Sequence, residues 1–137
     1  MVFATTTLGQ GRGQGRGSQG WGIKAEYQRL FDPTTLTTIQ GEVLAIENFI
    51  PRKGMGQGMH LKLKTGQDTI SVHLGPAWFL ENQDIVIAMK DVITVTGSKI
   101  VFDGASAIIA SEVTKGDQVL VLHDKNGIPA WAGWRNK

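Results

Sequence analysis

Residues Met59–Leu74 form the stretch that decides the fold: Met-His-Leu-Lys-Leu-Lys-Thr-Gly-Gln-Asp-Thr-Ile-Ser-Val-His-Leu. Apolar and polar side chains alternate strictly on both sides of a glycine-containing turn, which is the pattern of two antiparallel strands in a hairpin. With Gly66 and Gln67 as the turn, the predicted apolar pairs are Leu63–Ile70, Leu61–Val72 and Met59–Leu74. The same register pairs Lys64–Thr69, Lys62–Ser71 and His60–His73. The hairpin therefore has one face for a core and one polar outer face.

The sequence around this hairpin predicts further strands and one short helix. The expected elements are a strand over 36–50 bent at Gly41, a loop over 51–58, a short helix within 77–84, strands over 91–96 and 99–102 around Gly97-Ser98, and a strand over 106–113. Three strands, a short helix and two further strand regions are the order of a five-stranded OB barrel. We therefore predict an all-β, OB-type barrel with a short helix between its third and fourth strands.

Three regions are expected along the chain. Residues 1–24 form a tail with glycine at nearly every second position from Gly9 to Gly22, which cannot bury enough apolar surface to offset its ordering entropy. Residues 25–116 form the barrel, and this range begins with one or two helical turns over 25–31 that end at Asp32-Pro33. Residues 117–137 form a C-terminal hairpin or extension that we expect to pack back on the barrel.

Composition excludes several classes of function. The chain has no cysteine, which removes disulfides, thiolate zinc sites, haem attachment and cysteine nucleophiles. Its net charge of +2 divides into about +3 for residues 1–31 and about −1 for the remainder, so the body has no basic excess in its bulk count. No apolar run is long enough for a membrane-spanning helix. No catalytic triad, paired carboxylates or phosphate loop is visible, so we expect neither an enzyme nor a cofactor.

Five short stretches carry a resemblance to a known group. They are Tyr27–Pro33, Gly41–Val43, Val72–Trp78, Phe102–Gly104 and Asn126–Trp131, of which the His-Leu-Gly-Pro-Ala-Trp block is the most specific. They resemble a group of small bacterial OB-fold proteins, often exported and frequently labelled DNA-binding by fold analogy. The resemblance implies the fold and export to the periplasm or the cell exterior, although the start of the sequence shows no leader. It implies no catalytic residues.

The outer face of the hairpin is the predicted binding face, because strands two and three and the loop before them bind ligands in OB proteins. Its predicted residues are His60, Lys62, Lys64, Ser71 and His73, with Arg52 and Lys53 in the loop. The lysines favour an anionic ligand, but histidines stand where nucleic-acid binders carry stacking aromatics. Binding of single-stranded nucleic acid is therefore a second interpretation. His60 and His73 are candidate metal ligands, although no carboxylate shares their register.

The N-terminal tail offers a rival function. Its Thr5, Thr6, Thr7 and Leu8 favour an extended strand, and Arg12, Arg16 and Trp21 could add contacts. Such a tail can add to the edge of a neighbouring subunit and build a self-assembling structural protein of the filament type. The sequence thus leaves open a ligand-binding module, a homo-oligomer joined by its tail, and a nucleic-acid binder.

Overall fold

The computed structural model describes Trp21 and residues 26–132. These residues form mainly β-structure. The elements are the 3-10 helix η2 (Gln28–Leu30), β2 (Leu36–Phe49), β3 (Gly58–Thr65), β4 (Asp68–Pro76), α1 (Ala77–Leu80), β5 (Val92–Phe102), β6 (Ala105–Lys115) and β7 (Gln118–Val121). The all-β class and the short helix after the third strand are confirmed. Within this described part, no helix has both the length and the apolar character to cross a membrane.

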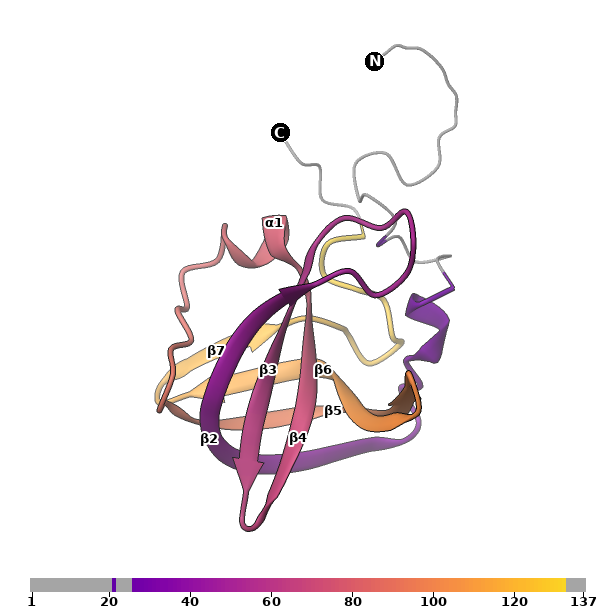
Figure 1. The fold of residues 1–137 in the computed structure, drawn as a ribbon. Coiled ribbons are helices and arrows are strands. Elements are labelled where there is room, and N and C mark those ends of the chain that lie inside the picture. The colour runs from indigo at the N-terminus through magenta and orange to yellow at the C-terminus, as the bar shows by residue number, and fades with distance from the viewer. Residues whose placement is uncertain (1–20, 22–25, 133–137) are drawn as a thin grey trace.

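Five of the strands close into a ring of hydrogen bonds. The sheet order is β4-β3-β2-β5-β6-β7, and β4 also pairs with β6, in parallel, so that β2 to β6 return upon themselves. The other neighbouring pairs are antiparallel. β7 lies outside the ring as a sixth strand along β6, close to the segment that follows α1 (Figure 1).

The hairpin register agrees with the alternation pattern over most of its length. The pairs from Thr65–Asp68 to His60–His73 all form as predicted. Met59, however, lies opposite Gly75 and not Leu74, because the register shifts between Met59 and His60. At Gly75 a Cβ atom would lie 2.8 Å from the ring of Trp131. Glycine thus lets that indole pack directly against β4.

Gly41 allows two strands to approach each other closely. A Cβ on Gly41 would lie 2.3 Å from the carbonyl oxygen of Lys64, and a further register shift follows between Val43 and Ala45. These features bend β2, whose first half pairs with β5 and whose second half pairs with β3. The bend predicted at Gly41 is therefore present.

The region around Gly97 differs from the prediction. The sequence suggested two strands around a turn at Gly97-Ser98, but β5 runs without a break from Val92 to Phe102. A Cβ on Gly97 would lie 2.3 Å from the carbonyl oxygen of Ile109, and the pairing of β5 with β6 shifts register at this point. Glycine therefore serves a close strand contact here and not a turn, and the two uses look alike in a sequence.

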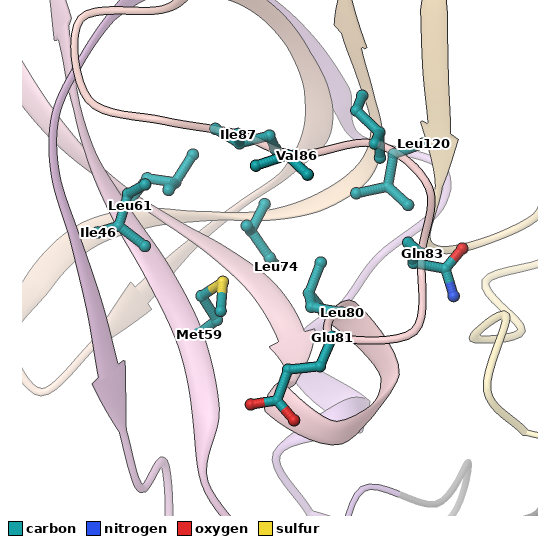
Figure 2. A pocket seen from close by; sticks show the side chains of 11 residues that line it. Ile46, Met59, Leu61, Leu74, Leu80, Glu81, Gln83, Val86, Ile87 and Leu120 are labelled. Atoms are coloured by element: carbon teal, nitrogen blue, oxygen red, sulfur yellow. The ribbon is translucent and has the colours of Figure 1, made fainter.

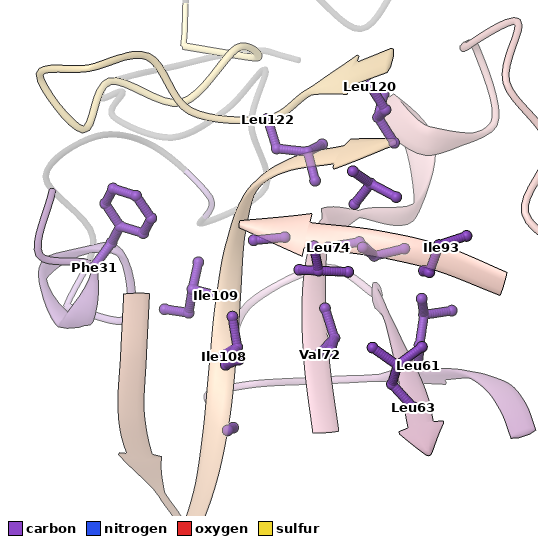
Figure 3. Close-up of a cluster of buried hydrophobic side chains, with 14 of the residues drawn as sticks. Phe31, Leu61, Leu63, Val72, Leu74, Ile93, Ile108, Ile109, Leu120 and Leu122 are labelled. Carbon is purple, nitrogen blue, oxygen red and sulfur yellow. The ribbon is translucent and has the colours of Figure 1, made fainter. Parts of the chain in front are cut away.

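The inside of the ring is filled by aliphatic side chains (Figure 3). Leu61, Leu63, Val72 and Val95 have no accessible surface, and Leu74 from β4 points into the same space. These are the residues of the apolar parity, so the alternation of the hairpin correctly identified the core face. Each such side chain contributes about 1.5–3 kcal/mol of transfer free energy on burial.

The sequence suggested that Trp21 belongs to an assembly tail. In the structure it belongs to the folded body. Its side chain is 1% exposed. Its indole Nε1 donates to the carbonyl oxygen of Gly56 at 3.1 Å, and its own carbonyl oxygen accepts from Nε1 of Trp131 at 2.7 Å. The two indole rings meet edge to face at 6.2 Å. The other residues of the proposed tail, Thr5, Thr6, Thr7, Leu8, Arg12 and Arg16, lie outside the described residues.

His123 ties the N-terminal segment to the C-terminal one. Its Nδ1 lies 2.8 Å from the carbonyl oxygen of Ala110, to which it donates, so its Nε2 accepts from the amide nitrogen of Gln28 at 2.8 Å. The ring of Phe31 stacks on the imidazole at 4.2 Å. Both ring nitrogens of this buried histidine are therefore occupied by structural hydrogen bonds.

We expect Trp21→Ala to lower the free energy of unfolding by about 3–5 kcal/mol, because it removes a large buried ring from between Trp131 and Phe49. Trp21→Phe keeps an aromatic ring and loses the hydrogen bond to Gly56, so its cost is about 1–2 kcal/mol. Urea unfolding followed by far-ultraviolet circular dichroism measures both. An unfolding midpoint for Trp21→Ala equal to that of the wild type would show that Trp21 does not stabilise the body.

Candidate functional site

The residues of the predicted binding face divide by exposure. Lys53 and Lys64 are exposed, whereas Arg52, Lys62 and Ser71 are half-buried. His60 is also half-buried, and His73 is buried with 2% of its surface exposed. The structure thus brings the basic residues to one side of β3, β4 and the preceding loop, but it withdraws one histidine from solvent.

The prediction that His73 lies on an open outer face is wrong. The side chain points away from the ring interior, as the alternation requires, but the N-terminal segment covers it. The hydroxyl oxygen of Tyr27 lies 2.6 Å from Nδ1 of His73, and the two rings stack at 5.9 Å. Alternation tells which side of a sheet a residue occupies, and it carries no information about a distant segment that packs over that side.

Two phenylalanines that were not predicted on this face surround the histidines. Phe49 stacks on His60 with ring centroids 4.6 Å apart, and Phe102 meets His73 edge to face at 4.9 Å. Both phenylalanines are half-buried. The face therefore has aromatic rings where the sequence indicated only imidazoles. The register shift after Val43 places Phe49 on this side, and such a shift has no clear mark in the sequence.

Arg52, in the loop after β2, contacts two other segments at the edge of this face. Its guanidinium carbon lies 5.0 Å from the ring centroid of Phe102, within the range of a cation–π contact. Its Nε also lies 3.7 Å from a carboxylate oxygen of Glu26, a loose and largely exposed ion pair. The loop after β2 and the end of β5 are therefore held together beside β3 and β4.

The histidine pair does not form a complete metal site in this structure. The His60 and His73 ring centroids lie 5.8 Å apart. Nε2 of His60 is bonded to Glu47 at 2.8 Å, and Nδ1 is buried without a hydrogen-bond partner. The part of the chain that is described contains no group of three or more histidine, aspartate or glutamate side chains arranged around a common point. A structural zinc site normally takes four ligands.

Burial determines the protonation of this cluster. It lowers the pKa of His73 from its usual 6.5 to about 4, and the nearby His60 and Lys62 act in the same direction. Burial also raises the pKa of the Tyr27 hydroxyl far above its usual value, against a smaller opposite effect of Arg52. Both groups are therefore neutral at pH 7. They are joined by a hydrogen bond, and neither of them contributes a charge to this face.

A separate apolar cavity of about 220 Å³ lies at one end of the ring (Figure 2). Ile46, Leu61, Leu74 and other aliphatic side chains line it, together with the segment that follows α1, and Glu81 and Gln83 are its polar members. Ligand pockets are commonly 300–1,000 Å³ and present several convergent polar groups. At about 220 Å³ the cavity is smaller than that, so the predicted binding face is the better candidate.

Stability is expected to fall as the pH decreases from 6.5 to 4. The pKa of His73 and that of His123 are both about 4, each lowered mainly by burial. Because these folded-state values lie below 6.5, protons favour the unfolded chain, and the stability is complete only above pH 6.5. The loss is on the order of 3 kcal/mol per histidine at most.

Urea unfolding at pH 7.0 and pH 4.5 measures this loss. His73→Gln should remove about half of the difference between the two pH values, and the double variant with His123→Gln should remove most of it. The pKa of Asp32 and that of Asp91 are lowered from 3.8 by hydrogen bonds, so these carboxylates titrate below the window. Equal stability of the wild type at both pH values would contradict the neutral, buried state of the histidines.

Comparison with known proteins identifies the family. Residues 35–120, well over half of the chain, match the MamS/MamX magnetosome protein family. The match includes three of the five stretches that resembled exported OB-fold proteins, and it does not support that label specifically. A search of curated proteins finds no match. The matched range contains β2 to β6 and all residues of the predicted binding face, from Arg52 to His73. The chain belongs to the MamS/MamX magnetosome protein family.

Proposed function

We propose that this chain is a non-enzymatic binding module that takes an anionic ligand on the basic face. We define the basic face as Arg52, Lys53, Lys62 and Lys64 together with Phe49 and Phe102. The observation that carries the proposal is the placement of the Arg52 guanidinium over the ring of Phe102, which contacts His73 on the outer side of β4. This places positive charge and flat apolar surface side by side.

The cations of this face remain available to a ligand. Lys53, Lys62 and Lys64 make no salt bridge with any residue in the described ranges. Arg52 is only loosely paired with the exposed Glu26. A ligand with two or more negative charges can therefore gain Coulomb energy here without breaking a buried ion pair.

The aromatic members supply a second kind of contact. Phe49 and Phe102 are partly exposed, and their packing on His60 and His73 fixes their orientation. A preorganised ring loses little entropy when a flat ligand group stacks on it. Stacking of bases on such rings is the usual source of energy in single-strand binding. The rings thus favour an anion that also carries planar groups.

The arrangement of the strands also favours the basic face as the binding site. In OB-type barrels, the face of strands two and three and the two loops beside it bind oligonucleotides and oligosaccharides. The loop after β2 and the turn after β5 occupy these positions here, and Arg52 and Phe102 join them. The family description suggests the magnetosome as the place where the module acts. Export from the cytoplasm stays a prediction from the sequence resemblance.

The histidines support a binding role more than a catalytic one. His73 uses Nδ1 to bond Tyr27, and His123 uses both nitrogens within the fold. A general base needs a nitrogen that can reach a substrate proton. Self-assembly through the N-terminal tail also stays a prediction, although Trp21 is buried in its own chain and cannot serve a neighbour at the same time.

We expect Lys62→Glu with Lys64→Glu to weaken binding of a fluorescein-labelled oligothymidylate of about 12 nucleotides by at least about tenfold at low salt. The reason is the reversal of two charges on the outer side of β3. Fluorescence anisotropy measures the affinity, and wild-type affinity should fall steeply as salt rises. The matched control is Lys99→Glu with Lys125→Glu, two exposed lysines outside the basic face, with an expected change under about threefold.

Inorganic polyphosphate serves as a second probe without bases. If both probes bind and both lose affinity in the Lys62→Glu, Lys64→Glu variant, the site is driven by charge. If the oligonucleotide binds more tightly than polyphosphate, the phenylalanines also contribute to binding. Failure of the wild type to bind either probe at low salt, or equal losses in the two double variants, would overturn the proposal.

A further inference from the structure

A second surface, independent of the basic face, lies along β7. A groove of about 570 Å³ follows Gln118–Val121 on the side away from β6. Its opposite wall is the segment 83–85 that follows α1, and Phe79 and Ala130 complete it. Figure 1 shows β7 and the segment after α1 on the same side of the molecule. The groove therefore opens onto the free edge of the last strand in the sheet.

The backbone of β7 is used on one edge only. All four residues pair with β6, and no other strand of the described chain pairs with them. Immediately after β7 the second edge is occupied: Ala130 donates its backbone N–H to Leu122 at 2.8 Å, and His123 bridges to Pro129. An extended segment in the groove would pair with the same edge of the chain that residues 129–130 pair with just after β7. Unpaired edges of this kind accept added strands.

The side chains around the groove suit an extended occupant. Val119 and Val121 are exposed by 54% and 50%, and Phe79 and Ile85 add apolar surface. Gln83, Asp84 and Gln118 supply polar groups in the same groove. A strand presents its side chains alternately to two sides, so one set can meet the apolar wall and the other the polar rim.

The N-terminal end of the described body lies near this groove. The Trp21 ring contacts the Trp131 ring at 6.2 Å, and Trp131 in turn contacts Phe79 at 5.5 Å. Phe79 lines the groove. The 13 peptide steps from Leu8 to Trp21 can extend over about 40 Å, several times the distance that these two ring contacts bridge. Residues before Gly9 can therefore reach β7 of their own chain.

The sequence of residues 1–20 matches the groove in two ways. Ala4-Thr5-Thr6-Thr7-Leu8 is uncharged and rich in a β-branched residue that favours strands. Residues 1–20 contain Arg12 and Arg16 and no acidic residue, whereas Asp84 lies in the groove and Asp117 precedes β7. The opposite charges favour docking and make it sensitive to salt.

We propose that residues 4–8 add to the free edge of β7 as a seventh strand within the same chain. The connection through Trp21 raises the local concentration of this segment at the groove to the millimolar range. A neighbouring copy at micromolar concentration competes poorly with it. The N-terminal segment then covers Val119 and Val121, and it removes an edge at which other chains could add.

The test is backbone hydrogen exchange of the full-length chain, read at Gln118–Val121 by NMR. Thr6→Pro removes one N–H and breaks strand pairing, so we expect the groove-side amides of β7 to exchange at least about tenfold faster than in the wild type. The matched control is Gln14→Pro, in the glycine-rich repeat, which should leave these rates within about twofold. Both variants change only residues before Trp21 and keep the body intact.

The concentration dependence separates the intrachain contact from one between copies. Equal protection at 20 μM and 500 μM, with a monomeric mass by sedimentation, supports the proposal. Protection that appears only at the higher concentration together with a dimer would overturn it in favour of docking between copies. Wild-type amides of β7 that exchange as fast as those in Thr6→Pro would show that the groove holds no N-terminal strand.

Discussion

The parallel contact between β4 and β6 is the constraint on which the rest of the structure depends. It joins Ser71, Val72 and His73 to Ala107, Ile108 and Ile109, and it turns an open sheet into a ring. Most of the antiparallel pairs join strands that follow each other in sequence, but this pair and β2–β5 bring together segments more than thirty residues apart. Non-local pairings of this kind must offset the entropy of closing a long loop. Their stability comes from the aliphatic side chains that the closed ring encloses.

The same contact explains why the outer side of β4 is buried at His73. Once β4 and β6 lie side by side, their outer surface is a continuous strip that includes His73 and borders Ala110. Tyr27, Gln28 and Phe31 lie along this strip and bond or stack with His73 and His123. The histidines are therefore neutral elements of a second, smaller packing layer. The exposed charge that remains falls on β3 and on the loop before it, and this confines the proposed binding surface to that side.

Local pattern was sufficient for much of the fold. The alternation in Met59–Leu74 correctly indicated the register from His60 to Thr65, because one buried face makes a one-residue slip costly. It failed at the register shifts near Val43, Met59 and Gly97, where close backbone contacts decide the geometry and a glycine has more than one interpretation.

The candidate site was predicted less completely for a related reason. Lys62, Lys64 and Arg52 were found because strand parity and loop position are local properties. Tyr27, Phe49 and Phe102 reach the face from three distant parts of the chain, and no spacing in the sequence links them. The burial of Trp21 was missed for the same reason, since its partners Gly56 and Trp131 lie 35 and 110 residues away. The composition of its surroundings, rich in glycine and arginine, suggested that Trp21 belongs to the tail.

The hydrogen bond from the Trp131 indole to the Trp21 carbonyl has a topological consequence. It brings together Trp21 and Trp131, which lie near the two ends of the described part of the chain, so the path of the backbone between them returns close to its starting point. The order in which the strands occur along the chain is then separable from their arrangement in space. A short peptide connecting these two points would allow the termini to be moved to the exposed Gly66-Gln67 turn, with every strand pairing of the ring retained.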